Sequence, residues 1–440
     1  MSENNEPTGG GLLQYVFDDK EQRRKFAQTL TGTIEGDIST ERVFEGKLLS
    51  IVSLDRSNYT HGFHKYPAKY IPEIPRWAIH KFTTRGNVVL DPFCGSGTTN
   101  VEAKLWARNS YAIDVDPLAR LLAKVKTTPL DEIKLRSQQN KLFNEIVKSN
   151  QSEIPSFPNR DYWFRGDVLE DLGIIYAAIL RIEDRDVREF FLVVLSSILK
   201  EVSNADPKFL YALAISRHMR AKTKRAIDAK KIFIERTNVL VPKMIAFSKA
   251  CSKESLAQII GEDARMIQLA DRTVNLVMTS PPYLNAVDYP RAHQLQLYWF
   301  GFWKGPLGEL KRAYIGNEQA PATLYSKMPK YGNELLDSIL KELWSIDKKR
   351  AYVVYQFFRD MRETMLEIKR VLVDEGHFCY AIADNLIRKI PVPTHTVIGQ
   401  IAEELGFARV DSFGSVLMMR PHDMRPSEKM SAEWVMTFRK

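Results

Sequence analysis

Residues 274–283 read Val-Asn-Leu-Val-Met-Thr-Ser-Pro-Pro-Tyr, and the rest of the chain is arranged around them. The apolar run 274–278 follows the polar residues 271–273 and is stopped by two prolines, as in a buried parallel strand. The tetrapeptide 280–283 is then the turn at the carboxyl end of that strand, where open α/β sheets bind their ligands. The stretch therefore predicts both a parallel sheet and the position of a site.

The turn combines rigid hydrogen-bond acceptors with an aromatic face. Neither Pro281 nor Pro282 has an N–H, so the carbonyl oxygens of Ser280 and Pro281 point in fixed directions without a local donor. Tyr283 adds a flat ring on which a planar ligand could stack. Such a turn suits a ring that carries an exocyclic amine, such as cytosine or adenine. The alternative is a plain strand-ending Pro-Pro turn with an exposed tyrosine, and the rest of the chain decides.

A second strand and turn lie earlier in the chain. Residues 87–90 form a short apolar strand, and residues 91–99 read Asp-Pro-Phe-Cys-Gly-Ser-Gly-Thr-Thr before a predicted helix at 100–108. The glycines allow a sharp turn close to a ligand, Thr98 and Thr99 can cap the helix, and its amino end favours a carboxylate. The string has neither the third glycine of a dinucleotide loop nor the Gly-Lys-Ser/Thr of a phosphate loop.

These two units together resemble the S-adenosylmethionine-dependent DNA methyltransferases that modify cytosine N4 or adenine N6. The resemblance covers residues 59–116 and 258–440, with the cofactor loop first and the Ser-Pro-Pro-Tyr motif later. It implies an α/β fold with a Rossmann-like seven-stranded methyltransferase sheet, and S-adenosyl-L-methionine as the cofactor. The catalytic residues that it implies are Ser280, Pro281, Pro282 and Tyr283.

The same resemblance implies that several segments hold the cofactor. The aromatic and basic segment 59–72 helps to hold the methionine end, although it also reads as a proline loop that packs its aromatics on the core. Asp114 ends the next strand and accepts the ribose hydroxyls, while Asp116 caps the following helix. Asp263, or its neighbour Glu262, accepts the adenine amino group. The implied cofactor-binding residues are His64, Tyr66, Lys69, Asp91, Pro92, Phe93, Gly95, Gly97, Thr98, Thr99, Asp114 and Asp263.

A long helical insertion interrupts the strands. The strand expected after residues 110–116 does not follow, and helical patterns occupy the interval up to about residue 257. A bare loop of that length would be improbable, so we expect a separate lobe. The expected organisation is a tail and helix at 1–40, a first catalytic part at 41–126, an inserted helical, basic lobe at 127–256, and a second catalytic part at 257–440 that includes an irregular DNA-facing region at 304–348.

The net charge of +9 is concentrated in one stretch. Residues 208–249 have an excess of basic over acidic residues that equals the net charge of the whole chain. We expect this stretch to contact the phosphates of double-stranded DNA; the alternative is a solvated face on a supporting helix. Residues 288–291, Asp-Tyr-Pro-Arg, read either as a helix start or as a wall of the target-base pocket. The expected DNA-binding residues are Arg217, Arg220, Lys222, Lys224, Arg225, Lys230, Lys231 and Arg291.

The resemblance implies a site-specific DNA methyltransferase that flips its target base out of the duplex. Ser280 favours cytosine N4, because serine at this position is associated with cytosine in the family, and adenine N6 is the alternative. A restriction-modification or other defence system is the expected setting, with a cognate endonuclease as a partner. The competing hypotheses are an RNA base methyltransferase and a non-catalytic DNA-binding subunit. Both motifs are intact, which argues against the second.

The remaining composition suits a protein of a reducing compartment. The three cysteines, Cys94, Cys251 and Cys379, are far apart and favour neither a disulfide framework nor a zinc site. His61 and His64 have no further metal ligand nearby in the sequence, so no metal is expected. No apolar run is long enough to span a bilayer and the first residues are unlike a signal peptide, so we expect a cytoplasmic protein with no membrane partner.

Overall fold

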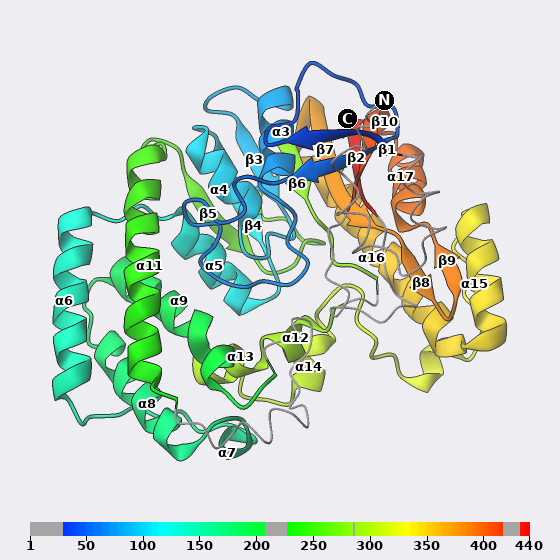
Figure 1. The fold of residues 1–440 in the computed structure, drawn as a ribbon. Coiled ribbons are helices and arrows are strands. Elements are labelled where there is room, and N and C mark those ends of the chain that lie inside the picture. The colour runs from blue at the N-terminus through cyan, green and yellow to red at the C-terminus, as the bar shows by residue number, and fades with distance from the viewer. Residues whose placement is uncertain (1–29, 207–226, 285–286, 417–431) are drawn as a thin grey trace, which may run out of the picture.

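The centre of the molecule is a large, mainly parallel sheet. A computed structural model describes residues 30–206, 227–284, 287–416 and 432–440. Within them, nine strands lie in the order β1-β2-β10-β11-β7-β6-β3-β4-β5 (Figure 1). Only β11 in this sheet runs antiparallel, and it pairs with β10 and β7. The strands are β1 (Leu30–Glu35), β2 (Lys47–Val52), β3 (Val88–Asp91), β4 (Asn109–Ile113), β5 (Ala257–Gly261), β6 (Val274–Thr279), β7 (Leu372–Ala383), β10 (Ala408–Val416) and β11 (Ala432–Arg439).

The predicted α/β fold with a Rossmann-like sheet is confirmed, but the predicted number of strands was too low. The seven expected strands are all present and lie side by side, as β5-β4-β3-β6-β7-β11-β10. Strands β1 and β2 extend the sheet beyond β10. Strand β1 was missed because its residues are mostly exposed and include Thr and Gly, so it has no apolar run. Residues 30–35 of the expected tail and helix form this strand, and residues 1–29 lie outside the described residues.

Helices cover both faces of the sheet. Helix α3 (Glu73–Phe82) places Trp77 and Ile79 against one face, together with Leu276 and Cys379 from the strands. Apolar residues of α15, α16 and α17 share a cluster with Val277 and Phe378, which point to the opposite face. Helices α4 (Thr98–Leu105) and α5 (Pro117–Thr127) follow β3 and β4 and connect the sheet to the inserted helices.

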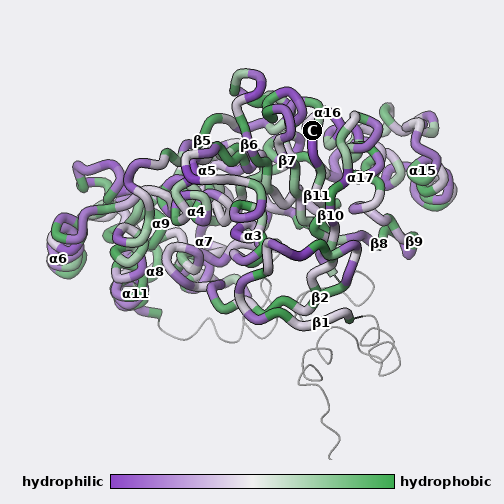
Figure 2. The backbone as a smooth tube through the Cα atoms, turned by 90° about the horizontal axis from the view of Figure 1, so that it is seen from above, coloured by the Kyte–Doolittle hydropathy of each residue, from purple (hydrophilic) through white to green (hydrophobic). Residues whose placement is uncertain are grey.

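The insertion between β4 and β5 is helical, as the sequence predicted. Its helices share one apolar cluster with Leu118 and Leu122 of α5, so the insertion packs against the sheet's own helices. Figure 2 shows α6 and α15 at opposite ends of the molecule, with the apolar strands between them. The helices of the insertion are α6 (Glu132–Lys148), α7 (Arg160–Trp163), α8 (Gly166–Leu180), α9 (Arg185–Val202) and α11 (Ala229–Ala250). Residues 207–226 of the basic stretch lie outside the described part.

The region 304–348 is more regular than predicted. Asn333 caps α15 by accepting a hydrogen bond from the N–H of Leu336, and that helix buries Leu336, Leu340 and Leu343. After the possible helix start at residues 288–291, two short helices follow one another, with His293 at the break. The elements of this half are α12 (Tyr289–Ala292), α13 (Gln294–Trp299), α14 (Leu307–Lys311), the 3-10 helix η1 (Ala322–Tyr325), α15 (Glu334–Ile346), α16 (Lys348–Val371), the hairpin β8 (Asn385–Ile387) with β9 (Ile390–Val392), and α17 (Thr394–Glu404).

Two negative findings concern the described residues alone. None of the helices there has both the length and the apolar composition needed to cross a membrane. No group of three or more His, Cys, Asp or Glu side chains is arranged there to hold a metal ion. Cys94, Cys251 and Cys379 are buried free thiols.

Candidate active site

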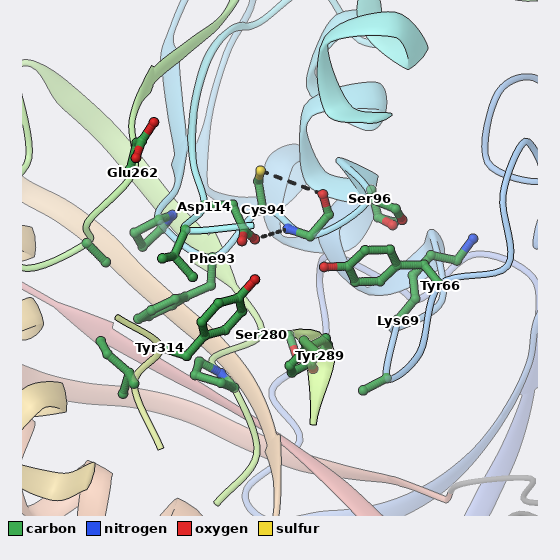
Figure 3. A pocket seen from close by; sticks show the side chains of 18 of the residues that line it. Tyr66, Lys69, Phe93, Cys94, Ser96, Asp114, Glu262, Ser280, Tyr289 and Tyr314 are labelled. Atoms are coloured by element: carbon green, nitrogen blue, oxygen red, sulfur yellow. Dashed lines mark hydrogen bonds between the residues drawn. The ribbon is translucent and has the colours of Figure 1, made fainter. Parts of the chain in front are cut away.

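A pocket opens at the carboxyl ends of the neighbouring strands β3, β4, β5 and β6. It brings the loop after β3 and the motif after β6 to one place, although about 180 residues separate them in the sequence (Figure 3). The predicted site residues that line it are Tyr66, Lys69, Pro92, Phe93, Gly95, Thr98, Asp114, Asp263, Ser280 and Pro282. The predicted residues that do not line it are His64, Asp91, Gly97, Thr99, Pro281 and Tyr283.

The loop after β3 is shaped by two glycines with positive φ. Gly95 has φ +48°, and a Cβ there would lie 3.1 Å from Cε1 of Tyr66. Gly97 has φ +77° and is the N-cap of α4. A Cβ on Gly97 would lie 2.8 Å from Cα of Ala123, so this glycine permits close packing of the loop on α5. The loop can therefore approach a ligand on one side while it rests on a helix on the other.

The threonines of this loop do not cap α4, which corrects the prediction. No side chain makes a cap hydrogen bond, because the left-handed Gly97 occupies the N-cap position. Thr99 Oγ1 instead donates to the carbonyl oxygen of Met278 over 3.2 Å and contacts Tyr70 Oη. Ser96 Oγ and Thr98 Oγ1 are buried and have no hydrogen-bond partner among the described residues, and both residues line the pocket. These two hydroxyls at the amino end of a helix are available to an anionic ligand group.

Asp114 lies in the pocket just beyond the end of β4. Its Oδ2 accepts a hydrogen bond from the N–H of Gly95 over 2.8 Å, and its Oδ1 accepts one from the N–H of Asp116 over 2.9 Å. Burial, and next the negative charge of Asp116, raise the pKa of the Asp114 carboxyl to about 7. Asp116 does cap α5, as predicted, by accepting a hydrogen bond from the N–H of Leu118.

Asp263 and Glu262 both line the pocket after β5. Asp263 is bound by Arg265, whose Nε and Nη2 each donate to its carboxylate over 2.9 Å. Burial would raise the pKa of Asp263, but the hydrogen bonds from Arg265 outweigh it and lower the pKa below its usual value. Glu262 pairs with Arg120 over 2.8 Å and is largely exposed. Asp263 is thus the more enclosed of the two acids.

Three tyrosines form much of the remaining wall. Tyr66 comes from the segment before α3, Tyr289 from α12 and Tyr314 from the segment after α14. Figure 3 shows Tyr66 and Tyr314 approaching from opposite sides, with Tyr289 and Ser280 beside them. Tyr314 was not predicted, because nothing in its local sequence marks it. Asp288 accepts a hydrogen bond from the N–H of Arg291 and so caps α12. Tyr289, the next residue, lines the pocket. The helix start and the pocket wall expected at residues 288–291 are therefore formed by different residues.

The tyrosine of the Ser-Pro-Pro-Tyr motif is buried, unlike the exposed tyrosine of the plain-turn alternative, and it does not line the pocket. The side chain of Tyr283 is only 8% exposed and packs in the apolar cluster below the pocket. Its hydroxyl donates to Oε1 of Glu433 over 2.6 Å. This partner comes from β11, far away in the sequence, so local patterns did not predict the contact. Ser280 and Pro282 line the pocket itself.

The other predicted residues lie outside the pocket. His64 Nε2 is 3.0 Å from Ser196 Oγ and Nδ1 is 2.8 Å from the carbonyl oxygen of Lys65, so His64 joins the pocket segment to α9. Lys230 pairs with Asp171 over 3.9 Å. Lys231 and Arg291 are exposed, and Arg291 is on α12, close in the chain to Tyr289. Arg217, Arg220, Lys222, Lys224 and Arg225 lie outside the described residues.

Comparisons with known proteins find methyltransferases. The N6/N4 family described as DNA methylase matches residues 11–124, which include the cofactor loop. The type II methyltransferase M.MvaI of Kocuria varians is 24% identical, with 83% of this chain and 86% of that protein covered. The type II methyltransferase M.BsoBI of Geobacillus stearothermophilus is 21% identical, with 84% and 82% covered. A solved methyltransferase structure from Methanosarcina mazei aligns with 8% identity and a TM-score of 0.31, covering 82% of this chain and 96% of that one.

Proposed function

We propose, from the premise that the chain belongs to the S-adenosylmethionine-dependent DNA methyltransferases of the N4/N6 family, that it methylates the exocyclic N4 of cytosine at a specific site in duplex DNA. One observation carries the proposal: Ser280 and Pro282 of the motif line the same pocket as Gly95 and Asp114. A donor held by the loop after β3 would therefore lie next to a base held by the motif after β6. Adenine N6 is the alternative substrate atom.

The pocket suits the cofactor of this family. The unpartnered hydroxyls of Ser96 and Thr98, at the amino end of α4, fit the carboxylate of its methionine part. Asp114 suits the ribose hydroxyls, and the enclosed Asp263 suits the adenine amino group. When bound, the cofactor supplies a methyl group on a positively charged sulfur, which is an electrophile. The residues of this chain then have to orient both reactants.

The motif provides acceptors for the amine of the target base. That amine is a weak nucleophile because its lone pair is delocalised into the ring. Ser280 Oγ, in the pocket, and the carbonyl oxygen of Pro281, the next residue of the motif although not one that lines the pocket, would accept hydrogen bonds from its two hydrogens. These hydrogen bonds would stabilise the positive charge that develops on the nitrogen. The base has to leave the duplex to reach these acceptors, since a stacked and paired amine is inaccessible. Serine at position 280 is the reason to prefer cytosine, by resemblance to the family.

We propose two surfaces that bind DNA, one beside the pocket and one on the inserted lobe. Arg291 is exposed near the pocket and is suited to a phosphate of the target strand. In the inserted lobe, Arg236 pairs with Glu201 over 2.7 Å and Lys249 pairs with Glu132 over 2.6 Å, so part of its basic charge is compensated within the lobe. We therefore infer that the lobe contributes to DNA binding through Lys231 and the basic residues before it. A defence system with a cognate endonuclease is the setting we propose, as for type II enzymes.

The direct test is to identify the methylated nucleoside. The protein is incubated with duplex DNA of varied sequence and cofactor labelled in the methyl group, and the digested DNA is analysed by mass spectrometry. We expect N4-methylcytosine, and about 100-fold less of it in the same time with Ser280→Ala. N6-methyladenine in place of it would support the alternative, and methyl transfer to structured RNA but not to DNA would refute the proposal. Sequencing of the modified DNA then gives the recognition site.

A further inference from the structure

A buried carboxyl group holds the tyrosine of the catalytic motif. Tyr283 Oη donates to Glu433 Oε1 over 2.6 Å, and Glu433 is 3% exposed. Among the described residues, no lysine, arginine or histidine lies within ion-pair distance of Glu433, and its hydrogen bond is to Tyr283 alone. Burial of a carboxyl group with so little compensation is unfavourable, and it raises the pKa of Glu433 to about 7. A core position with no further role would be filled by an apolar side chain.

The topology explains how the last strand reaches the motif. Strand β11 runs antiparallel to β7, and Glu433 is paired with Ala383, at the carboxyl end of that strand. The neighbouring strand β6 ends at Thr279, directly before the motif, and Thr279 is paired with Tyr380 of β7. The antiparallel direction of β11 therefore brings its beginning, not its end, to the edge of the sheet where the pocket lies. Glu433 approaches Tyr283 from beneath the motif.

The contact fixes a residue that the backbone alone leaves free to rotate. Pro281 and Pro282 stiffen the chain before Tyr283, but the ring can still turn about its own side-chain bonds. The hydroxyl bond to Glu433 joins the outer end of that ring to a strand of the sheet. The ring also packs in a cluster with Leu284 and Ile315, and Ile315 lines the pocket. A change in the position of Tyr283 would therefore reach the pocket floor and the acceptors of Ser280 and Pro281.

We propose that Glu433 is a positioning residue for methyl transfer, which holds Tyr283 by its hydroxyl and so keeps the Ser-Pro-Pro-Tyr motif in the geometry that receives the target base. The inference rests on the proposed function of that motif. Glu433 itself neither lines the pocket nor touches the reacting atoms. Its effect should therefore appear in turnover and not in the affinity for the cofactor.

A double-mutant cycle tests the proposal. Glu433→Ala, Tyr283→Phe and the double variant are assayed for turnover, for KM of DNA and for cofactor affinity by calorimetry. Each single variant should lower kcat by about 10- to 100-fold, a range typical of a misplacement of about 1 Å, while the cofactor Kd stays within about twofold. The double variant should be no slower than the slower single variant, because both changes remove the same bond.

A conservative variant and a matched control separate positioning from general stability. In Glu433→Gln the amide oxygen can still accept the tyrosine hydroxyl, so most of the turnover should return. Thr437, further along the same strand, accepts a buried hydrogen bond from Cys379 Sγ; Thr437→Val removes it, and turnover should be unchanged. Multiplying effects in the double variant, an equal loss in Thr437→Val, or full turnover in Glu433→Ala would each overturn the proposal. Absence of methyl transfer in the wild-type protein would refute the proposed function instead.

Discussion

Thr279 Oγ1 donates a hydrogen bond of 2.6 Å to Oδ1 of Asp91. These are the last residues of β6 and β3, two paired strands of the sheet. The bond joins the start of the cofactor loop to the start of the Ser-Pro-Pro-Tyr motif, and the N–H of Phe93 donates to the same oxygen over 3.1 Å. Burial raises the pKa of the Asp91 carboxyl to about 6. Asp91 thus acts from beneath the pocket, where it connects the two motifs.

Removing this bond should weaken both the fold and the alignment of the two motifs. In Thr279→Val the buried Asp91 carboxyl loses one of its donors, which should lower the free energy of unfolding by about 1–3 kcal/mol. Turnover should fall more than the affinity for either substrate. Denaturant unfolding and steady-state kinetics measure the two effects. Thr273→Val, just before β6, removes a solvent-exposed hydrogen bond to the carbonyl oxygen of Ala270; it is the control and should change neither. Wild-type values in Thr279→Val would show that the bond is dispensable.

Ser280 should act in the chemical step. Ser280→Ala removes an acceptor for the target amine, so turnover should fall by about 100-fold, as for the loss of one preorganised transition-state hydrogen bond. The cofactor Kd, measured by calorimetry, should change by less than about threefold, since the loop after β3 is intact. Ser345→Ala on α15 provides a serine control far from the pocket. A Ser280→Ala variant that turned over normally would remove the motif from the mechanism.

The two glycines of the cofactor loop should respond differently to the same substitution. Gly97→Ala forces a Cβ against Cα of Ala123 at a left-handed φ, so it should mainly lower the melting temperature. Gly95→Ala places its Cβ against Tyr66 in the pocket and should mainly lower cofactor affinity, by about tenfold for a loss near 1.4 kcal/mol. Thermal melting with and without cofactor distinguishes the two. If both variants showed the same melting temperature and the same shift on adding cofactor, the assignment of separate roles to the two glycines would be contradicted.

Asp114 should make stability and cofactor affinity change in opposite directions with pH. Its pKa is raised to about 7 in the folded protein, so the folded state binds a proton more tightly than the unfolded state. The contribution of this group to the free energy of unfolding is fully present below about pH 3.9, the pKa of the group in the unfolded protein. It is lost as the pH rises through about 7. Ribose hydroxyls bind the ionised carboxylate better, so cofactor affinity should rise over the same interval.

The Asp114→Asn variant separates this group from the other buried acids. Its cofactor affinity should be lower and nearly independent of pH from about 5 to 8, because the amide does not titrate in that interval. The melting temperature of the cofactor-free variant should also fall less as the pH is raised. Calorimetry and thermal melting at matched ionic strength measure both. A variant whose affinity still rises steeply with pH would assign the titration to a different group.

The two candidate DNA surfaces can be tested separately. Arg291→Glu alters the surface beside the pocket, and Lys231→Glu alters the inserted lobe. If each residue contacts a phosphate, each variant should bind DNA more weakly and lower the slope of log K against log salt by about 1. Lys47→Glu, an exposed residue at the start of β2 near the other edge of the sheet from β5, should leave the slope unchanged. If the slope for Lys231→Glu were unchanged, this part of the lobe would support the fold without contacting DNA.

The sequence predicted the strands of the sheet because their signals are local. Buried parallel strands such as 88–91 and 274–279 are continuous apolar runs, and the turns after them contain Gly or Pro. Strand β1 gave no such signal, since it lies at an edge of the sheet and its residues stay exposed. Helix α15 was hidden for another reason: its apolar residues follow a Gly- and Pro-rich segment that suggested an irregular region.

Residues brought to the site by tertiary packing were beyond local prediction. Tyr314 lies on a segment without a motif and reaches the pocket only because the chain after α14 folds over it. Glu433 is an ordinary residue of a strand until the antiparallel pairing of β11 places it under Tyr283. The expectation that Thr98 and Thr99 cap α4 was wrong because Gly97, which packs against Ala123 of α5, occupies the N-cap position.

The position of β11 between β7 and β10 also bears on biosynthesis. Both motifs leave the ribosome before this strand does, so a nascent chain can present the cofactor loop and the Ser-Pro-Pro-Tyr turn while the buried edges of β7 and β10 are still open. Such a chain lacks the carboxyl group that holds Tyr283. Competence for methyl transfer would then begin only when translation has delivered the antiparallel strand.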